Sequence, residues 1–166
     1  MSYQVRLLRT DDLPSVTEIY NAACRAREST QGIRHWSIYE MKHFLFEAQR
    51  SFPSYTCVDN GHVVGWTAFT RYRVRESIGD TAEMSLYVER SFRHKGIGSL
   101  LANTILNRAS AIDLHCIFAL TFKDTPDVIS FAERKCRFSV VGSLPEVFSD
   151  GEHCYDIVVL ERPARG

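Results

Sequence analysis

This 166-residue chain lacks the features that mark several special classes of protein. Its 20 Lys and Arg residues balance 20 Asp and Glu residues, so the formal net charge at pH 7 is zero. A general nucleic-acid or membrane-surface binder normally carries a basic excess. No apolar run approaches the roughly 18 residues that cross a bilayer. The first residues show no basic stretch followed by an apolar one, so we expect no secretory signal.

Disulfide and metal patterns are also missing. The five cysteines are scattered and odd in number, and none lies in a Cys-x-x-Cys pair. Such a set is typical of free thiols in a reducing cytoplasm, where we expect the protein to work. Neither the cysteines nor the six histidines have the spacing of zinc ligands, so we expect no metal site.

The chain does contain alternating strand and helix patterns. Strands are predicted near residues 5–8, 55–58, 62–69, 81–88, 116–120, 138–143 and 153–161, and helices near 11–25, 37–48, 99–110 and 126–135. No repeat, low-complexity stretch or linker interrupts them. We therefore predict a single α/β domain over residues 1–166, with a mixed central sheet and flanking helices.

Local signals place several of these elements. Thr10 offers an N-cap for the first helix, and Ser37 to Glu40 forms a capping box for the second. Asn60-Gly61 is a strong hairpin signal. The crossover from the strand at 81–88 to the strand at 116–120 predicts that these two strands are parallel.

The most informative segment is Arg93-His94-Lys95-Gly96-Ile97-Gly98, which lies between a predicted strand and a helix. Unpaired N–H groups and the helix dipole attract anions at a helix start, and glycines let the backbone approach them closely. Arg93 and Lys95 add positive charge, so a pyrophosphate is the expected guest. A plain tight turn explains two glycines alone about as well. The spacing fits neither a Rossmann loop, because Leu101 stands at the third glycine position, nor a Walker loop.

Together with Leu86-Tyr87-Val88, the motif Arg93-x-x-Gly96-x-Gly98 resembles the acyl-CoA signature of the GNAT superfamily of N-acetyltransferases. More narrowly, the chain resembles the phosphinothricin and methionine sulfoximine acetyltransferase group. The similar pieces are Ile19-Tyr20-Asn21, Phe52-Pro53, Gly61-x-Val63-Val64-Gly65, Thr81-x-Glu83-x-Ser85-x-Tyr87-Val88 and Tyr155-Asp156.

This resemblance covers most of residues 5–160 and implies the GNAT fold. It implies transfer of acetyl from acetyl-CoA to the primary amine of a small, amino-acid-like acceptor. The transfer would be a direct attack in a ternary complex, without a covalent enzyme intermediate. It also implies a homodimer.

The resemblance assigns the cofactor to one region of the chain. The strand at 81–88 would splay away from the strand at 116–120 and admit the pantetheine arm. The residues expected to hold acetyl-CoA are Leu86, Tyr87, Val88, Arg93, His94, Lys95, Gly96, Ile97, Gly98 and Ser99.

Glu83 is the general base that the resemblance implies. An α-ammonium must lose a proton before its nitrogen attacks, and a carboxylate can accept that proton when its surroundings adjust its pKa. The alternative is a solvated strand glutamate, or an ion-pair partner of Arg73 or Arg75.

The acceptor site is expected to use Arg73, Thr81, Glu28 and Tyr20. The donor fork of Arg73 suits a carboxylate, although a solvated polar loop is the plainer explanation of that segment. Asn21, Trp36 and Tyr39 could line the same pocket, or belong to the core.

The sequence also departs from the subgroup. Ile78 stands where a tyrosine is usual, residues 121–125 lack an asparagine that touches CoA, and Arg137 replaces a helix-ending glycine. Phe131, Ala132 and Glu133 offer no clear general acid. Two alternatives therefore stay open: a GNAT enzyme with another acyl donor or acceptor (a polyamine, an antibiotic or a protein N-terminus), or a non-catalytic acyl-CoA-binding module.

Overall fold

A mixed seven-stranded sheet forms the centre of the computed structural model, which describes residues 2–47, 52–71 and 80–164. The strands are β1 (Tyr3–Leu7), β2 (Ser54–Asp59), β3 (His62–Arg71), β4 (Thr81–Val88), β5 (Cys116–Phe122), β6 (Ser139–Ser149) and β7 (Cys154–Pro163). Their order across the sheet is β1-β2-β3-β4-β5-β7-β6. The β4–β5 pair is parallel, as predicted, and the other pairs are antiparallel.

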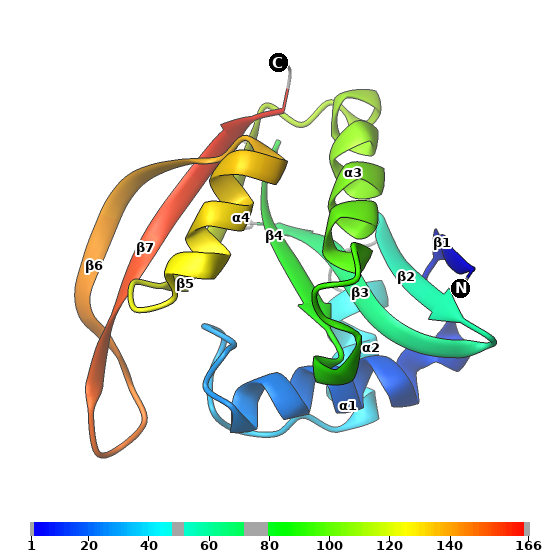
Figure 1. Cartoon of the computed structure of the whole chain (residues 1–166), viewed down its shortest axis with the longest axis horizontal. Coiled ribbons are helices and arrows are strands. Elements are labelled where there is room, and N and C mark those ends of the chain that lie inside the picture. The colour runs from blue at the N-terminus through cyan, green and yellow to red at the C-terminus, as the bar shows by residue number, and fades with distance from the viewer. Residues whose placement is uncertain (1, 48–51, 72–79, 165–166) are drawn as a thin grey trace.

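Helices cover both faces of this sheet (Figure 1). They are α1 (Leu13–Arg25), α2 (Ile38–Lys42), α3 (Ile97–Ala109) and α4 (Pro126–Cys136). On one face, α1 and α2 bury Tyr20 and Met41 against Trp66 of β3. On the other face, α3 and α4 cover a cluster that includes Ile105 and Ile117. The predicted α/β architecture and element order are confirmed, and no described helix is long and apolar enough to cross a membrane.

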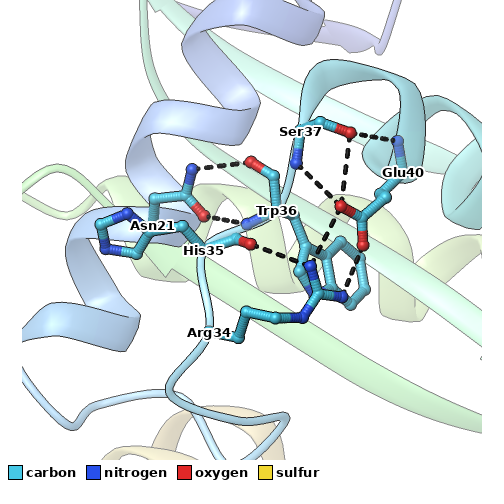
Figure 2. Close-up of polar contacts among 6 residues, drawn as sticks. All are labelled: Asn21, Arg34, His35, Trp36, Ser37 and Glu40. Carbon is cyan, nitrogen blue, oxygen red and sulfur yellow. Dashed lines mark hydrogen bonds and ion pairs between the residues drawn. The ribbon is translucent and has the colours of Figure 1, made fainter.

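Two local signals are confirmed in detail. Asn60 and Gly61 have φ values of 49° and 80°, the pair of positive angles that a tight hairpin requires. The capping box at the start of α2 also forms, as Figure 2 shows. The Glu40 N–H donates to Ser37 Oγ at 3.1 Å, and the Ser37 N–H donates to Glu40 Oε1 at 3.3 Å.

The predicted cap of the first helix was wrong. Thr10 begins a 3-10 turn, Thr10–Asp12, and α1 follows directly. Asp12 supplies the capping oxygen instead, because its Oδ2 accepts the Arg9 N–H at 2.8 Å. The same buried carboxylate binds Arg6 through two contacts of 2.7 and 2.9 Å, which fasten the start of α1 to β1.

The second helix is shorter than predicted. The α-helical part ends at Lys42, and His43–Glu47 continues as a π-helical turn. Leu45 is buried within that turn and Met41 within α2, so the apolar positions that predicted the helix still face the core. The apolar spacing could not distinguish an α-helical from a π-helical turn.

The end of α4 carries a strained residue. Arg137 adopts φ 60° and ψ 31°, a left-handed conformation that β-carbon sterics disfavour. Its conformation allows the Phe138 N–H to bond back to Ala132 O at 3.0 Å and close the helix. The left-handed cap that a glycine would normally provide is thus present, with an arginine in it.

We expect Arg137→Gly to raise the free energy of unfolding by about 0.5–1 kcal/mol, because glycine adopts this conformation without the side-chain penalty. The matched control is Arg134→Gly, also exposed but inside α4, which should lower it by about 1 kcal/mol. Urea denaturation measures both. Equal destabilisation by the two changes would contradict the assigned strain.

Candidate active site

The central feature of the site is a place where two parallel strands separate. β4 pairs with β5 only through Thr81–Cys116, Ala82–Ile117 and Glu83–Phe118. Residues 84–88 continue beside β3, but within the described chain they have no partner on the β5 side. The predicted splay between these strands is therefore present, and it begins at Glu83.

The glycine loop lies at the far end of β4. A 3-10 turn, Arg90–Phe92, follows the strand and leads to His94 and Gly96, which have φ values of 61° and 86°. α3 begins at Ile97, and its first intrahelical bond runs from the Leu100 N–H to Gly96 O. The N–H groups of residues 97–99 therefore point out of the helix end, which is the arrangement that binds phosphate oxygens.

Close packing surrounds Gly98. A β-carbon built at this position would lie 3.4 Å from Phe131 Cζ and 3.8 Å from Leu86 Cδ2. Phe131 of α4 therefore sits against both the glycine loop and β4, near the splayed strands. The N–H groups of residues 97–99, which we call the cradle, lie beside the apolar side chains of Phe131 and Leu86. This combination fits an anionic cofactor with an extended arm.

Glu83 lies at the closed end of the splay. Its side chain is half-buried, and no cation of the described residues pairs with it. Burial raises the pKa of the Glu83 carboxyl above the ordinary glutamate value. Folding therefore favours the protonated form, so this group's contribution to stability is full at low pH and is lost as pH rises through the raised pKa.

One face of β4 carries the polar residues of the site. Because side chains alternate along a strand, Thr81, Glu83, Ser85 and Tyr87 share the face that α1 covers. Glu83 and Val88 are five residues apart, or about 17 Å along a strand. A bound molecule must be long to place an anion at the glycine loop and a reacting group beside Glu83.

The loop after α1 covers this polar face, which the sequence did not reveal. Ser29 Oγ lies 2.9 Å from the Tyr87 hydroxyl, and Gln31 Nε2 donates to Ser85 Oγ at 3.0 Å. Both contacts join residues more than 50 positions apart. No local pattern predicts such pairs, so Ser29 and Gln31 were missed.

The residues predicted for the acceptor are dispersed. Thr81 is half-buried on the Glu83 face. Tyr20 is only 1% exposed and packs against Trp36 and Tyr87, with ring centroids 4.7 and 5.6 Å away. Glu28 pairs with two arginines, Arg90 and Arg93. Arg73, like Arg75 and Ile78, lies outside the described residues, so these acceptor contacts stay predictions.

Asn21 and Trp36 serve a structural purpose. Asn21 Nδ2 donates to Trp36 O at 3.0 Å, and the Trp36 N–H donates to Asn21 Oδ1 at 2.8 Å (Figure 2). The Trp36 ring also packs on Phe44 at 5.1 Å. These contacts hold the loop between α1 and α2 against the helices, whereas Tyr39 is 74% exposed on α2.

Two threonines lie near the start of α4. Thr121 Oγ1 and Thr125 Oγ1 lie 3.2 Å apart, in the segment where the resemblance led us to expect an asparagine. Further along, Phe131 and Ala132 pack on the core and Glu133 is exposed. Residues 131–133 therefore place no acidic side chain inward.

A shallow cavity of about 230 Å³ lies elsewhere, lined by Lys123, Asp124, Cys154, Tyr155 and Asp156. None of the residues of β4 or the glycine loop lines it. The predicted site residues of β4 and the glycine loop therefore lie apart from this cavity. Among the residues that the structure describes, no group of three or more His, Cys, Asp or Glu side chains could hold a metal ion.

Known proteins match this chain over most of its length. A Bacillus subtilis protein (strain 168), provisionally named as a phosphinothricin acetyltransferase, is 28% identical over 159 residues, or 95% of this chain and 97% of its own. An L-methionine sulfoximine/L-methionine sulfone acetyltransferase of Pseudomonas paraeruginosa is 28% identical over 152 residues, covering 89% of this chain and 86% of its own.

Solved structures share the fold. One, provisionally named as a phosphinothricin N-acetyltransferase, has a TM-score of 0.90 at 26% identity and covers 99% of this chain and 100% of its own. A phosphinothricin acetyltransferase from Sinorhizobium meliloti, solved in complex with acetyl-CoA, has a TM-score of 0.89 at 24% identity, covering 98% and 89%.

The model of the acetyltransferase (GNAT) family matches residues 13–138, which is most of the chain and includes β4, the glycine loop and α3. The splayed strands and the helix-start cradle agree with that match, as does the order of the elements. The chain therefore belongs to the GNAT family and is an N-acetyltransferase.

Proposed function

We propose that the protein transfers acetyl from acetyl-CoA to the primary amine of a small, amino-acid-like acceptor, of the phosphinothricin or methionine sulfoximine type. One observation carries the proposal: a single strand, β4, holds a half-buried Glu83 where its pairing with β5 ends, and leads to the glycine loop at its other end. The names of the relatives support the acceptor class.

The residues proposed for acetyl-CoA lie along this path. The N–H groups near Ile97, Gly98 and Ser99 would bind the pyrophosphate, with Lys95 and His94 beside them. The unpaired edge of Leu86 to Val88 would bind the pantetheine arm. The Val88 carbonyl already accepts a hydrogen bond from Arg93 Nε at 3.3 Å. The pantetheine arm and the Arg93 side chain would therefore lie next to each other at this end of β4.

Glu83 would act as the base for the acceptor. The thioester supplies an activated acetyl group, and the ammonium of the acceptor must first give up a proton, which Glu83 accepts directly or through water. The amine nitrogen then bonds to the carbonyl carbon, the C–S bond breaks, and the thiolate takes a proton from solvent. Burial suits the task because the raised pKa makes Glu83 a stronger base than an exposed glutamate.

The test is thiol release from acetyl-CoA with amino acids, methionine sulfoximine, phosphinothricin and polyamines as acceptors. We expect release with an amino-acid analogue and an approximately 100- to 10,000-fold loss of rate in Glu83→Gln, with CoA affinity retained. The wild-type rate should fall as pH drops through the raised pKa of Glu83. Glu18→Gln, on an exposed α1 glutamate, is the control. Unchanged turnover in Glu83→Gln would remove Glu83 from the mechanism, and polyamine turnover alone would change the acceptor class.

A second test uses two glycines with nearly the same backbone. Gly96 and Gly61 have φ values of 86° and 80°, and a β-carbon at either meets nothing within 4 Å. Alanine at each should therefore cost about 1 kcal/mol of stability. Only Gly96→Ala should also weaken CoA binding, by about tenfold, because its β-carbon hinders the close approach of the phosphate to the backbone. Equal CoA affinity in the two variants, measured by calorimetry, would argue against the cradle.

We also propose that the enzyme is a homodimer that pairs through β6. This strand is at the edge of the sheet, and ten of its eleven residues are exposed, including Val140, Val141, Leu144 and Val147. Long apolar edge strands that stay uncovered tend to pair with another chain. A second copy would bury these side chains.

Light scattering after gel filtration tests the dimer. We expect twice the mass of one chain for the wild type and a single chain's mass for the double variant Val141→Lys/Val147→Lys. Val128→Lys, on an exposed valine of α4, should leave the mass unchanged. A wild-type monomer at tens of micromolar, or a dimer that survives both β6 charges, would exclude this interface.

A further inference from the structure

Glu28 pairs with two arginines, Arg90 just before the glycine loop and Arg93 at its start. Its Oε2 pairs with Arg93 Nη1, and its Oε1 lies 3.3 Å from Arg90 Nη2. The Glu28 and Arg93 side chains are each about one-third exposed, at 31% and 34%. The pair therefore lies at the surface beside the site proposed for the pyrophosphate, within reach of an entering ligand.

Arg93 contacts two partners, the Val88 carbonyl and the Glu28 carboxylate. Its Nε donates to Val88 O at 3.3 Å, at the end of β4, while its Nη1 faces Glu28. A guanidinium binds a carboxylate and a phosphate through the same fork of donors. A carboxylate that occupies the fork therefore opposes phosphate binding at the same donors, and its negative charge also repels the phosphate.

We propose that Glu28 competes with the pyrophosphate for Arg93 and thereby sets the affinity of the protein for CoA. The inference rests on the proposed function, because it takes the glycine loop as the pyrophosphate site. Binding of the cofactor breaks the Arg93–Glu28 pair, and Arg93 transfers to the phosphate.

Other contacts hold the loop that carries Glu28. Arg27 pairs with Asp124 at 3.1 Å and stacks over the Tyr155 ring at 3.9 Å. Ser29 bonds to the Tyr87 hydroxyl, and the Glu28 N–H bonds to Ala23 O at 2.8 Å. Removal of the Glu28 carboxylate should therefore leave the backbone in place, so its effect on binding can be read without loss of the fold.

The position of Glu28 also bears on its predicted contact with the acceptor. The carboxylate is predicted to contact the acceptor, but two arginines engage it in the structure. Both arginines lie at the cofactor end of β4, about 17 Å along the strand from Glu83, so the carboxylate is placed to act on the cofactor.

Calorimetry with CoA and with pantetheine, which lacks the pyrophosphate, tests the competition. We expect Glu28→Gln to bind CoA roughly fivefold more tightly, the size of a partly exposed ion pair, and to bind pantetheine as the wild type does. The control Glu18→Gln removes the partner of Arg25 on α1, and it should change the affinity for neither CoA nor pantetheine. In an Arg93→Gln background, the gain from Glu28→Gln should shrink, because the contested guanidinium is gone.

The outcomes separate this inference from the proposed function. If the wild type binds CoA and Glu28→Gln binds it equally or more weakly, the competition is wrong and the cofactor site stands. If tightening is the same for pantetheine, Glu28 acts on the loop and not on the pyrophosphate, which also overturns the inference. If the wild type does not bind CoA, the proposed function fails and the inference fails with it.

Discussion

The arrangement of the site depends on one constraint, which is that β4 loses its parallel partner after Glu83. A strand inside a sheet normally satisfies its backbone on both sides, and beyond this residue β4 does so only on the β3 side. Near this unpaired part of β4, Phe131 of α4 and Leu86 of β4 both lie close to Gly98 in the first turn of α3. The same strand therefore carries an open backbone edge, with the proposed base Glu83 at one end and the proposed pyrophosphate site at the other.

Sequence reasoning predicted the elements whose causes are local. The Asn60-Gly61 turn needs two positive φ angles at adjacent positions, and the Ser37–Glu40 box closes within four residues. The order of strands and helices followed from periodicity, and the parallel β4–β5 pair followed from the crossover between them. The splay of β4 from β5 and the choice of Glu83 as base came from the resemblance to GNAT enzymes, whereas the end of the pairing at Glu83 was found only in the structure.

Contacts between distant segments could not be predicted in this way. The Arg93–Glu28 pair and the Gln31–Ser85 bond join a loop after α1 to the β4 region, and only the folded chain brings them together. Thr10 was predicted as the cap from its residue type. In the structure Asp12 accepts the Arg9 N–H instead, and the same carboxylate also binds Arg6 of β1, a distant contact that the local pattern does not show. The left-handed Arg137 was a departure visible in the sequence, but its conformation follows from the turn between α4 and β6.

The site concentrates features that oppose stability. Glu83 is half-buried without a described cation, and His94 has a positive φ near Gly96. Both features make the free energy of folding less favourable than a neutral side chain and a relaxed backbone would. The supporting elements are correspondingly firm: β4 lies between the core under α1 and the core under α3, and the buried Asp12–Arg6 pair fixes the start of α1. Since the Asp12–Arg6 pair makes no contact with Glu83 or the glycine loop, substitutions at the proposed acceptor and cofactor contacts should leave this anchor in place. The loop that holds Ser29, Gln31 and Glu28 is then the part of the molecule best placed to adjust the acceptor, because it reaches the β4 face through side chains alone.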